Sequence, residues 1–213
     1  MCCSYYVKEK TNYDAFLGLG LVPKLEPRWA QMQTLNPGSE ALMIVAGGLQ
    51  SLSGQDFPDP QILPAISDPQ ILTALGIWGF PGKNGGLIIN ARAETVLVRP
   101  TFAGSAENRR CVLPAACFYE WDAEKNRVTF TDPEREVIYL AGVWKLIEDR
   151  LRFVVLTTAA NASMVPVHDR MPLMMDAKDV EPWLFSRKDA ERLLRREMPL
   201  LRAERENEQM RLF

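Results

Sequence analysis

The chain has 213 residues, of which 47% are hydrophobic and 24% are charged, and its formal net charge is −2. This composition is typical of a globular protein and excludes a disordered chain, while the length fits one domain over residues 1–213. The near-neutral charge argues against a protein that coats nucleic acid through bulk charge, although it is compatible with a small basic groove.

The first third of the chain contains few signals for regular structure. We expect, in chain order, a strand over residues 1–7, a short helix capped by Asn12 and ending at Leu17, irregular chain over 23–38, a buried strand over 41–45 and a loop over 50–69. The irregular segments are predicted because Pro, Gly and polar turn-forming residues are frequent there.

The middle of the chain is rich in β-branched and aromatic residues, which favour strands. We expect these strands over residues 87–90, 112–113, 118–121, 128–131, 137–143 and 153–158. The intervening segments 122–126 and 148–150 have the length of hairpin turns.

The last part of the chain predicts helices. Asp176 and Ser186 are each followed three residues later by an aspartate, a weak relative of the capping box. Ala190 and Leu193 lie on one helical face, which Pro199 should interrupt, and we expect the last dozen residues to fray. The elements together predict an α+β domain dominated by antiparallel strands.

The four cysteines (Cys2, Cys3, Cys111 and Cys117) are too few to form a disulfide framework in a chain of this length. No apolar signal segment follows Met1, and no apolar run is long enough to cross a membrane. We therefore expect reduced thiols in the cytoplasm. The single histidine and the lack of a second cysteine pair predict no metal site, and we expect no cofactor.

Cys2 is the first candidate for chemistry, because initiator methionine is normally removed before a small residue. The exposed cysteine then carries both a thiol and a free α-amine. The amine can condense with an aldehyde to a Schiff base, and the thiolate can then close a five-membered thiazolidine ring. Reference pKa values of about 7.8 and 8.5 leave part of the amine neutral and part of the thiol ionised near pH 7. On position alone, a cysteine here is more often a terminal residue without a role.

Residues 90–95 carry an amide, a guanidinium and a carboxylate at alternate positions. On an extended chain, the side chains of Asn90, Arg92 and Glu94 would share one face. A solvated strand has the same pattern, so this segment leaves a functional and a structural interpretation open.

Glu120 lies among the aromatic residues of segment 118–121. Burial there would raise its pKa and suit it to general acid–base chemistry, whereas a position at a strand edge would turn it toward water. His168 is the only histidine, and Asp169 and Arg170 follow it. A lone histidine is more often a hydrogen-bonded structural residue than a catalyst, but these charged neighbours favour a functional role.

Nine short segments follow one another in an order that matches a known family. They are residues 1–2, 36–38, 78–80, 90–95, 110–115, 118–121, 141–144, 156–161 and 168–172. On these segments the chain resembles the SRAP family, named for SOS-response-associated peptidase, whose members form protein–DNA crosslinks at abasic sites. The resemblance implies an α+β fold of mainly antiparallel strands, arranged as a barrel-like or bifurcated sheet with flanking helices.

The resemblance also implies roles for individual residues. Cys2 matches the nucleophile that captures the ring-opened deoxyribose aldehyde, and Asn90 matches the amide that holds the terminal amine. Glu120 matches the residue that shuttles protons during Schiff-base formation, and His168 matches the one that helps to open the sugar. Three further positions match phosphate contacts, namely Arg92, Arg99 and Arg170.

The implied partner is single-stranded DNA that contains an abasic site, which the crosslink would shield during the DNA damage response. The resemblance implies a monomer in the cytoplasm that associates with the nucleoid when it is bound to DNA. It implies no metal, no cofactor and no membrane.

Some positions depart from the family pattern. Cys3 and Ser4 replace a usual Gly-Arg pair, and the loop before Asn90 is short and lacks the usual tryptophans. Since phosphate contacts and base stacking both contribute to affinity, we expect intact crosslinking chemistry with a reduced grip on DNA. Two alternatives stay open: an N-terminal cysteine peptidase or amide hydrolase that uses Cys2 with its own amine as base, and a non-catalytic DNA-binding member.

Overall fold

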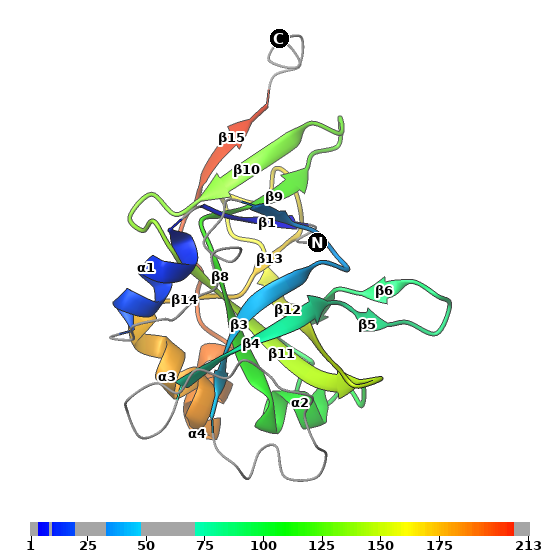
Figure 1. Cartoon of the computed structure of the whole chain (residues 1–213). Coiled ribbons are helices and arrows are strands. Elements are labelled where there is room, and N and C mark those ends of the chain that lie inside the picture. The colour runs from blue at the N-terminus through cyan, green and yellow to red at the C-terminus, as the bar shows by residue number, and fades with distance from the viewer. Residues whose placement is uncertain (1–3, 9, 20–32, 48–70, 207–213) are drawn as a thin grey trace.

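The fold is described from a computed structural model, over residues 4–8, 10–19, 33–47 and 71–206. Within these residues it is mainly β, with short helices (Figure 1). The strands are β1 (Ser4–Val7), β2 (Gln33–Leu35), β3 (Glu40–Ala46), β4 (Ile71–Trp78), β5 (Phe80–Pro81), β6 (Leu87–Ile88), β7 (Asn90–Arg92), β8 (Arg110–Ala115), β9 (Cys117–Trp121), β10 (Arg127–Thr131), β11 (Ile138–Ile147), β12 (Arg150–Ala159), β13 (Arg170–Pro172), β14 (Met174–Met175) and β15 (Arg202–Arg205). The helices are α1 (Thr11–Gly18), α2 (Ala103–Asn108), α3 (Ala177–Phe185) and α4 (Arg187–Leu193).

Five strands of the large sheet close into a small barrel. β12 pairs with β4, β4 with β3, β3 with β8 and β8 with β11, and β11 pairs again with β12. The β12–β4 pairing is parallel and the other pairings are antiparallel, so the barrel is mixed. Closure gives each of these strands a neighbour on both sides.

The barrel interior is filled by alternate side chains of its strands. Met43, Leu113 and Phe153 belong to this interior cluster and are fully buried. Glycine is required where strands approach closely: a Cβ on Gly76 would lie 2.7 Å from the Met43 sulfur, and one on Gly142 would lie 2.8 Å from Leu113. The interior therefore has the dense, interdigitated packing of a protein core.

The helices cover the outside of the barrel. Val112 and Val154 point outward, one position along from interior residues, and join a second hydrophobic cluster. Val180 and Trp183 of α3 and Leu193 of α4 pack in this outer cluster. The barrel wall is thus buried on both faces.

A second sheet, with the strand order β15-β10-β9-β1-β2, lies beside the barrel (Figure 1). It packs against the interior cluster. Its inner side chains include Tyr5, Phe118 and Phe130, which join the barrel's interior cluster. The Tyr5 ring lies 5.3 Å from that of Trp78 in β4, between centroids. This contact joins the second sheet to the barrel, with β9 as a central strand between β10 and β1.

The predicted fold class and most of the predicted elements are confirmed. Glu148 and Asp149, between β11 and β12, both have positive φ (52° and 57°), as a type I′ hairpin turn requires. Ser186 caps α4 by accepting a hydrogen bond from the Asp189 amide, whereas the Asp176 side chain makes no such cap for α3. Helix α1 begins at Thr11, whose hydroxyl accepts from the Lys8 amide, one residue before the predicted cap.

Seven elements depart from the sequence-based expectations. β2 lies within the segment predicted as irregular and β15 lies where fraying was predicted. The other five were not predicted: β4, β5, β13, β14 and α2. Gly76 interrupts the apolar run of β4, and α2 has no side-chain cap. All four residues of β15 are exposed, and the strand forms by backbone pairing with β10. The predicted loop over residues 50–69 lies outside the described residues. No helix in the described part of the chain is long and apolar enough to cross a membrane.

Candidate active site

Asn90 is the first residue of β7. This strand pairs with β12 just beyond the residues of β12 that pair with β4. β7 runs parallel to β12, with Asn90 opposite Val155 and Arg92 opposite Thr157. Val155 belongs to the interior cluster, whereas Ala91 belongs to the outer one. Because side chains alternate along a strand, Asn90 faces the interior side of the sheet.

Glu120 approaches the same interior cluster from the second sheet. It lies in β9, two residues after Phe118 and therefore on the same face, and Phe118 belongs to the interior cluster. Only 2% of Glu120 is exposed. The alternative of a strand-edge glutamate turned toward water is therefore wrong.

His168 precedes β13 and is held by its backbone and by its ring. Its amide donates to the Met164 carbonyl at 3.0 Å, and Met164 is part of the interior cluster. The ring Nδ1 lies 3.0 Å from the Arg170 amide nitrogen and 2.8 Å from Oδ1 of Asp169. One nitrogen cannot accept from the amide and donate to the carboxylate at once, so these two contacts suit the neutral and the protonated ring respectively.

Burial lowers the pKa of His168 below its usual 6.5, although the carboxylate of Asp169 opposes this shift. The neutral ring is therefore favoured at neutral pH. With Nδ1 accepting from the Arg170 amide, the neutral ring carries its proton on Nε2. Nε2 is then the proton donor of the neutral ring. Nδ1 has a partner in both protonation states: the Arg170 amide when the ring is neutral and the Asp169 carboxylate when it is protonated.

Arg170 forms a bidentate ion pair with Glu94. Its Nη1 and Nη2 donate to the two carboxylate oxygens at 2.7 and 2.8 Å, and Nη2 also donates to the Thr157 carbonyl at 2.6 Å. Arg170 is the main cause that lowers the pKa of Glu94. The expectation that Asn90, Arg92 and Glu94 share one strand face is wrong for Glu94, because β7 ends at Arg92 and Glu94 lies in the following turn.

Arg92 and Arg99 are both exposed. Arg92 contributes to the lowered pKa of Glu94, which places its charge near that carboxylate. Arg99 lies in the turn before α2, where its amide donates to the Thr95 carbonyl and its own carbonyl accepts from Phe102. Their roles as phosphate contacts stay predictions.

Cys2 and Cys3 lie outside the described residues. Cys111 and Cys117 are buried free thiols, and burial raises the pKa of both. Buried thiols of raised pKa are poor nucleophiles, so neither competes with Cys2 as a reactive residue. In the described ranges, no group of His, Cys, Asp and Glu side chains could hold a metal ion.

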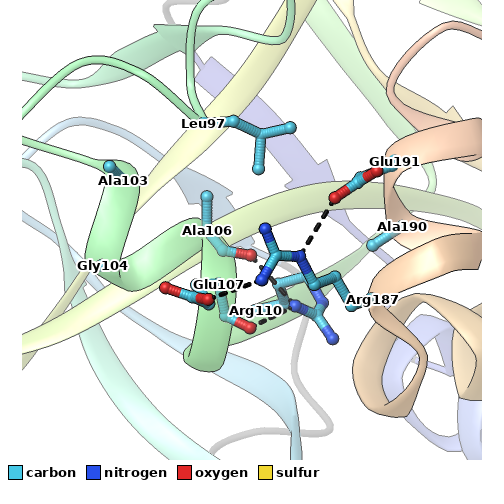
Figure 2. A pocket seen from close by; sticks show the side chains of 9 residues that line it. All are labelled: Leu97, Ala103, Gly104, Ala106, Glu107, Arg110, Arg187, Ala190 and Glu191. Atoms are coloured by element: carbon cyan, nitrogen blue, oxygen red, sulfur yellow. Dashed lines mark hydrogen bonds and ion pairs between the residues drawn. The ribbon is translucent and has the colours of Figure 1, made fainter.

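A cavity of about 120 Å³ lies elsewhere, between α2, α4 and the start of β8 (Figure 2). Ala106 and Ala190 in its lining belong to the outer cluster. Arg110 and Arg187 also line it, but Arg187 is engaged by Glu107 and Glu191. None of Asn90, Glu120 and His168 lines this cavity, so it is separate from the site predicted from the sequence. The burial of Arg110 was not predicted, because nothing in the sequence of segment 110–115 indicates a buried charge.

Three comparisons place these features among known proteins. The sequence model of the SOS response associated peptidase (SRAP) family matches residues 1–211. Abasic site processing protein YoqW of Bacillus subtilis is 31% identical over 116 residues, which are 50% of this chain and 52% of that protein. Abasic site processing protein YedK of Escherichia coli is 26% identical over 116 residues, with the same two shares. The aligned part thus spans about half the length of these curated relatives.

Solved structures match over nearly the whole chain. One protein from Bacteroides thetaiotaomicron has a TM-score of 0.71 at 18% identity and covers 98% of this chain and 93% of its own. Another, from Bordetella bronchiseptica, has the same TM-score and identity and covers 97% and 100%. At this identity the likeness concerns the fold. Because the family model spans nearly every residue, the chain belongs to the SRAP family.

Proposed function

We propose that this protein captures abasic sites in single-stranded DNA through a thiazolidine between Cys2 and the ring-opened deoxyribose. The main support is that Asn90, Glu120 and the segment of His168, far apart in sequence, all adjoin the interior cluster of the barrel. The names of the relatives, abasic site processing proteins, agree with this substrate.

Covalent geometry supports a meeting of Cys2 and Glu120. Successive Cα atoms are about 3.8 Å apart, so the Cα of Cys2 lies within about 7.6 Å of that of Ser4 whatever conformation the terminus adopts. Ser4 is paired with Tyr119, the neighbour of Glu120. The amine and thiol of a mature Cys2 therefore start from the strand next to the one that carries the buried carboxylate.

In the proposed reaction, Nε2 of His168 donates a proton to the ring oxygen while the C1′ hydroxyl loses one, which opens the sugar to its aldehyde. The amine of Cys2 attacks the aldehyde carbon, and Asn90 holds this amine by a hydrogen bond. Glu120 protonates the hydroxyl of the resulting carbinolamine, so that water leaves and an imine forms. The thiolate then attacks the imine carbon and the nitrogen takes up a proton, which closes the thiazolidine; one water is released overall.

The test is incubation of the mature protein with single-stranded DNA that carries one abasic site. We expect a band that survives denaturation, with a mass equal to protein without Met1 plus DNA minus one water. Cys2→Ser should lose the stable adduct, whereas Cys3→Ser, the matched control, should keep it. A folded wild-type protein that forms no adduct at any salt concentration contradicts the proposal.

The same experiment separates the two alternatives. An amide hydrolase would turn over a peptide or glutamine in the absence of DNA and would also depend on Cys2. A non-catalytic DNA-binding protein would bind the same DNA with an affinity that is indifferent to Cys2→Ser.

A further inference from the structure

We propose that Asn161 is a positioning residue: with Ser163 it fixes the loop that carries His168 and ties this loop to the chain segment that leads to the sheet of Glu120. This inference rests on the proposed function, because it concerns how two reacting groups of the same site are held. In the proposed reaction Asn161 does not touch the reacting atoms and acts only through the position of His168.

The loop between β12 and β13 is compact, and His168 lies near its end. The Ala160 amide donates to the Asp169 carbonyl at 3.0 Å, which closes the loop. Within the loop, the Asn161 carbonyl accepts from the Met164 amide, and the Met164 carbonyl accepts from the His168 amide, both at 3.0 Å. The His168 backbone is therefore held by successive hydrogen bonds that begin at Asn161.

The Asn161 side chain uses its full hydrogen-bonding capacity. Its Nδ2 donates to the carbonyls of Met198 and Pro199, at 3.1 and 2.8 Å. Its Oδ1 accepts from the amide and the hydroxyl of Ser163, at 3.1 and 2.6 Å. An amide side chain has two donor hydrogens and two acceptor lone pairs, so all four are occupied. The Ser163 hydroxyl in turn accepts from the Leu201 amide at 3.0 Å, so the network joins the β12–β13 loop to the segment between α4 and β15.

This segment leads to the sheet that carries Glu120. It continues into β15, which pairs with β10 (Figure 1). Val128 of β10 lies opposite Arg205 of β15 on one side and opposite Glu120 of β9 on the other. Leu201, at the end of the segment, is buried in the interior cluster. The segment therefore connects the β12–β13 loop, on the barrel, with the second sheet.

The relative position of His168 and Glu120 matters because both act on the same sugar in the proposed reaction. His168 lies in a loop, so the hydrogen bonds within this loop fix its place, whereas Glu120 is held by strand pairing on both sides of β9. A displacement of a reacting group by about 1 Å can cost roughly a hundredfold in rate. A network that ties the loop to the second sheet should therefore affect the rate of crosslinking more than the affinity for DNA.

The experiment compares Asn161→Ala with Leu193→Ala. The first variant removes the four side-chain hydrogen bonds without adding a charge. The second removes a buried side chain of α4 in the outer cluster, so it lowers stability without touching the site. Three quantities are measured on each folded variant: the single-turnover crosslinking rate at saturating protein, the affinity for DNA with a tetrahydrofuran abasic analogue, which has no aldehyde, and the His168 titration by NMR without DNA.

We expect Asn161→Ala to lower the saturating rate by about tenfold to a hundredfold and to change the affinity less than about twofold. The pKa of His168 should rise toward its ordinary value, because a loosened loop exposes the ring to water. Leu193→Ala should keep the wild-type rate and titration. Ser163→Ala should change both quantities in the same direction but less, and Ser163→Thr, which keeps the hydroxyl, should retain the wild-type values.

Two results would overturn the inference. One is an unchanged saturating rate in folded Asn161→Ala. The other is an equal slowing in Leu193→Ala, which would reduce the effect to stability. If Asn161→Ala does not fold, the comparison of Ser163→Ala with Ser163→Thr decides by the same measurements, and the absence of any difference between them contradicts the positioning role.

The titration without DNA keeps this inference separate from the proposed function. If the wild-type protein forms no adduct, the proposed function fails. A His168 titration that shifts in Asn161→Ala but not in Leu193→Ala supports the positioning role even then, and an unchanged titration in Asn161→Ala contradicts it.

Discussion

Arg110 offers the sharpest test of the packing outside the site. It is 6% exposed and donates to four backbone carbonyls, those of Ala106 and Glu107 in the last turn of α2 and those of Trp183 and Leu184 in the last turn of α3. A cation between two helix C-termini is favoured by both helix dipoles. Arg110→Met keeps an unbranched chain of similar volume and removes all four hydrogen bonds.

The expected loss of stability follows from two opposing free energies. Hydrogen bonds from a charged donor contribute roughly 1.5–3 kcal/mol each, whereas taking a guanidinium out of water costs several kcal/mol. Burial indeed lowers the pKa of Arg110, which records this desolvation. We expect Arg110→Met to lower the free energy of unfolding by about 3–5 kcal/mol, because carbonyls lose their partner. At about 2–4 °C per kcal/mol for a chain of this size, the Tm should fall by about 6–20 °C.

The assay is urea denaturation with thermal melting, and Arg187→Met is the control. Arg187 lines the same cavity but its side chain is 69% exposed, and its pairs with Glu107 and Glu191 are surface ion pairs (Figure 2). Pairs of this kind contribute about 0.2–1 kcal/mol each. If Arg110→Met stays within about 1 kcal/mol of the wild type, the four hydrogen bonds do not stabilise the helix ends and the reasoning fails.

Three further predictions concern the site and the thiols. Glu120→Gln should slow crosslinking by about 10²–10⁴-fold in a single-turnover gel assay, while Glu124→Gln on the same hairpin leaves the rate unchanged. The His168 ring should titrate below 6.5 by NMR. Because its folded pKa is lowered, stability should fall as the pH drops through the unfolded value and level off below the folded one; a His168→Gln variant that keeps this dependence would contradict the assignment. Cys111 and Cys117 should resist alkylation in the native protein and react in denaturant, as peptide mass mapping would reveal.

Runs of β-branched and aromatic residues were enough to predict most of the central strands. In β9 the aromatic residues around Glu120 left burial and a strand edge as alternatives, and the structure shows the carboxylate buried. β4 was missed because Gly76 interrupts its run of apolar residues. β15 was missed for the opposite reason, since all of its side chains are exposed and only backbone pairing holds it.

Contacts between distant segments could not be predicted from local sequence pattern. The pair of Glu94 with Arg170 joins residues 76 positions apart, and nothing local to either residue indicates its partner. The parallel pairing of β7 with β12 could not be predicted either, because it depends on how the barrel closes. The resemblance indicates Asn90, Glu120 and His168 as a set, and their roles stay predictions. That all three approach one cluster could be seen only in the fold.

The departures at the N-terminus bear on how the protein would hold DNA. Ser4 is buried in β1 opposite Tyr119, so this position presents no cation to the strand backbone. Phosphate binding would then fall to Arg92, Arg99 and Arg170, and affinity should be modest. A covalent mechanism tolerates modest affinity, because capture depends on the ratio of the crosslinking rate to the dissociation rate. Precise placement of the reacting groups would therefore matter more to this protein than tight binding.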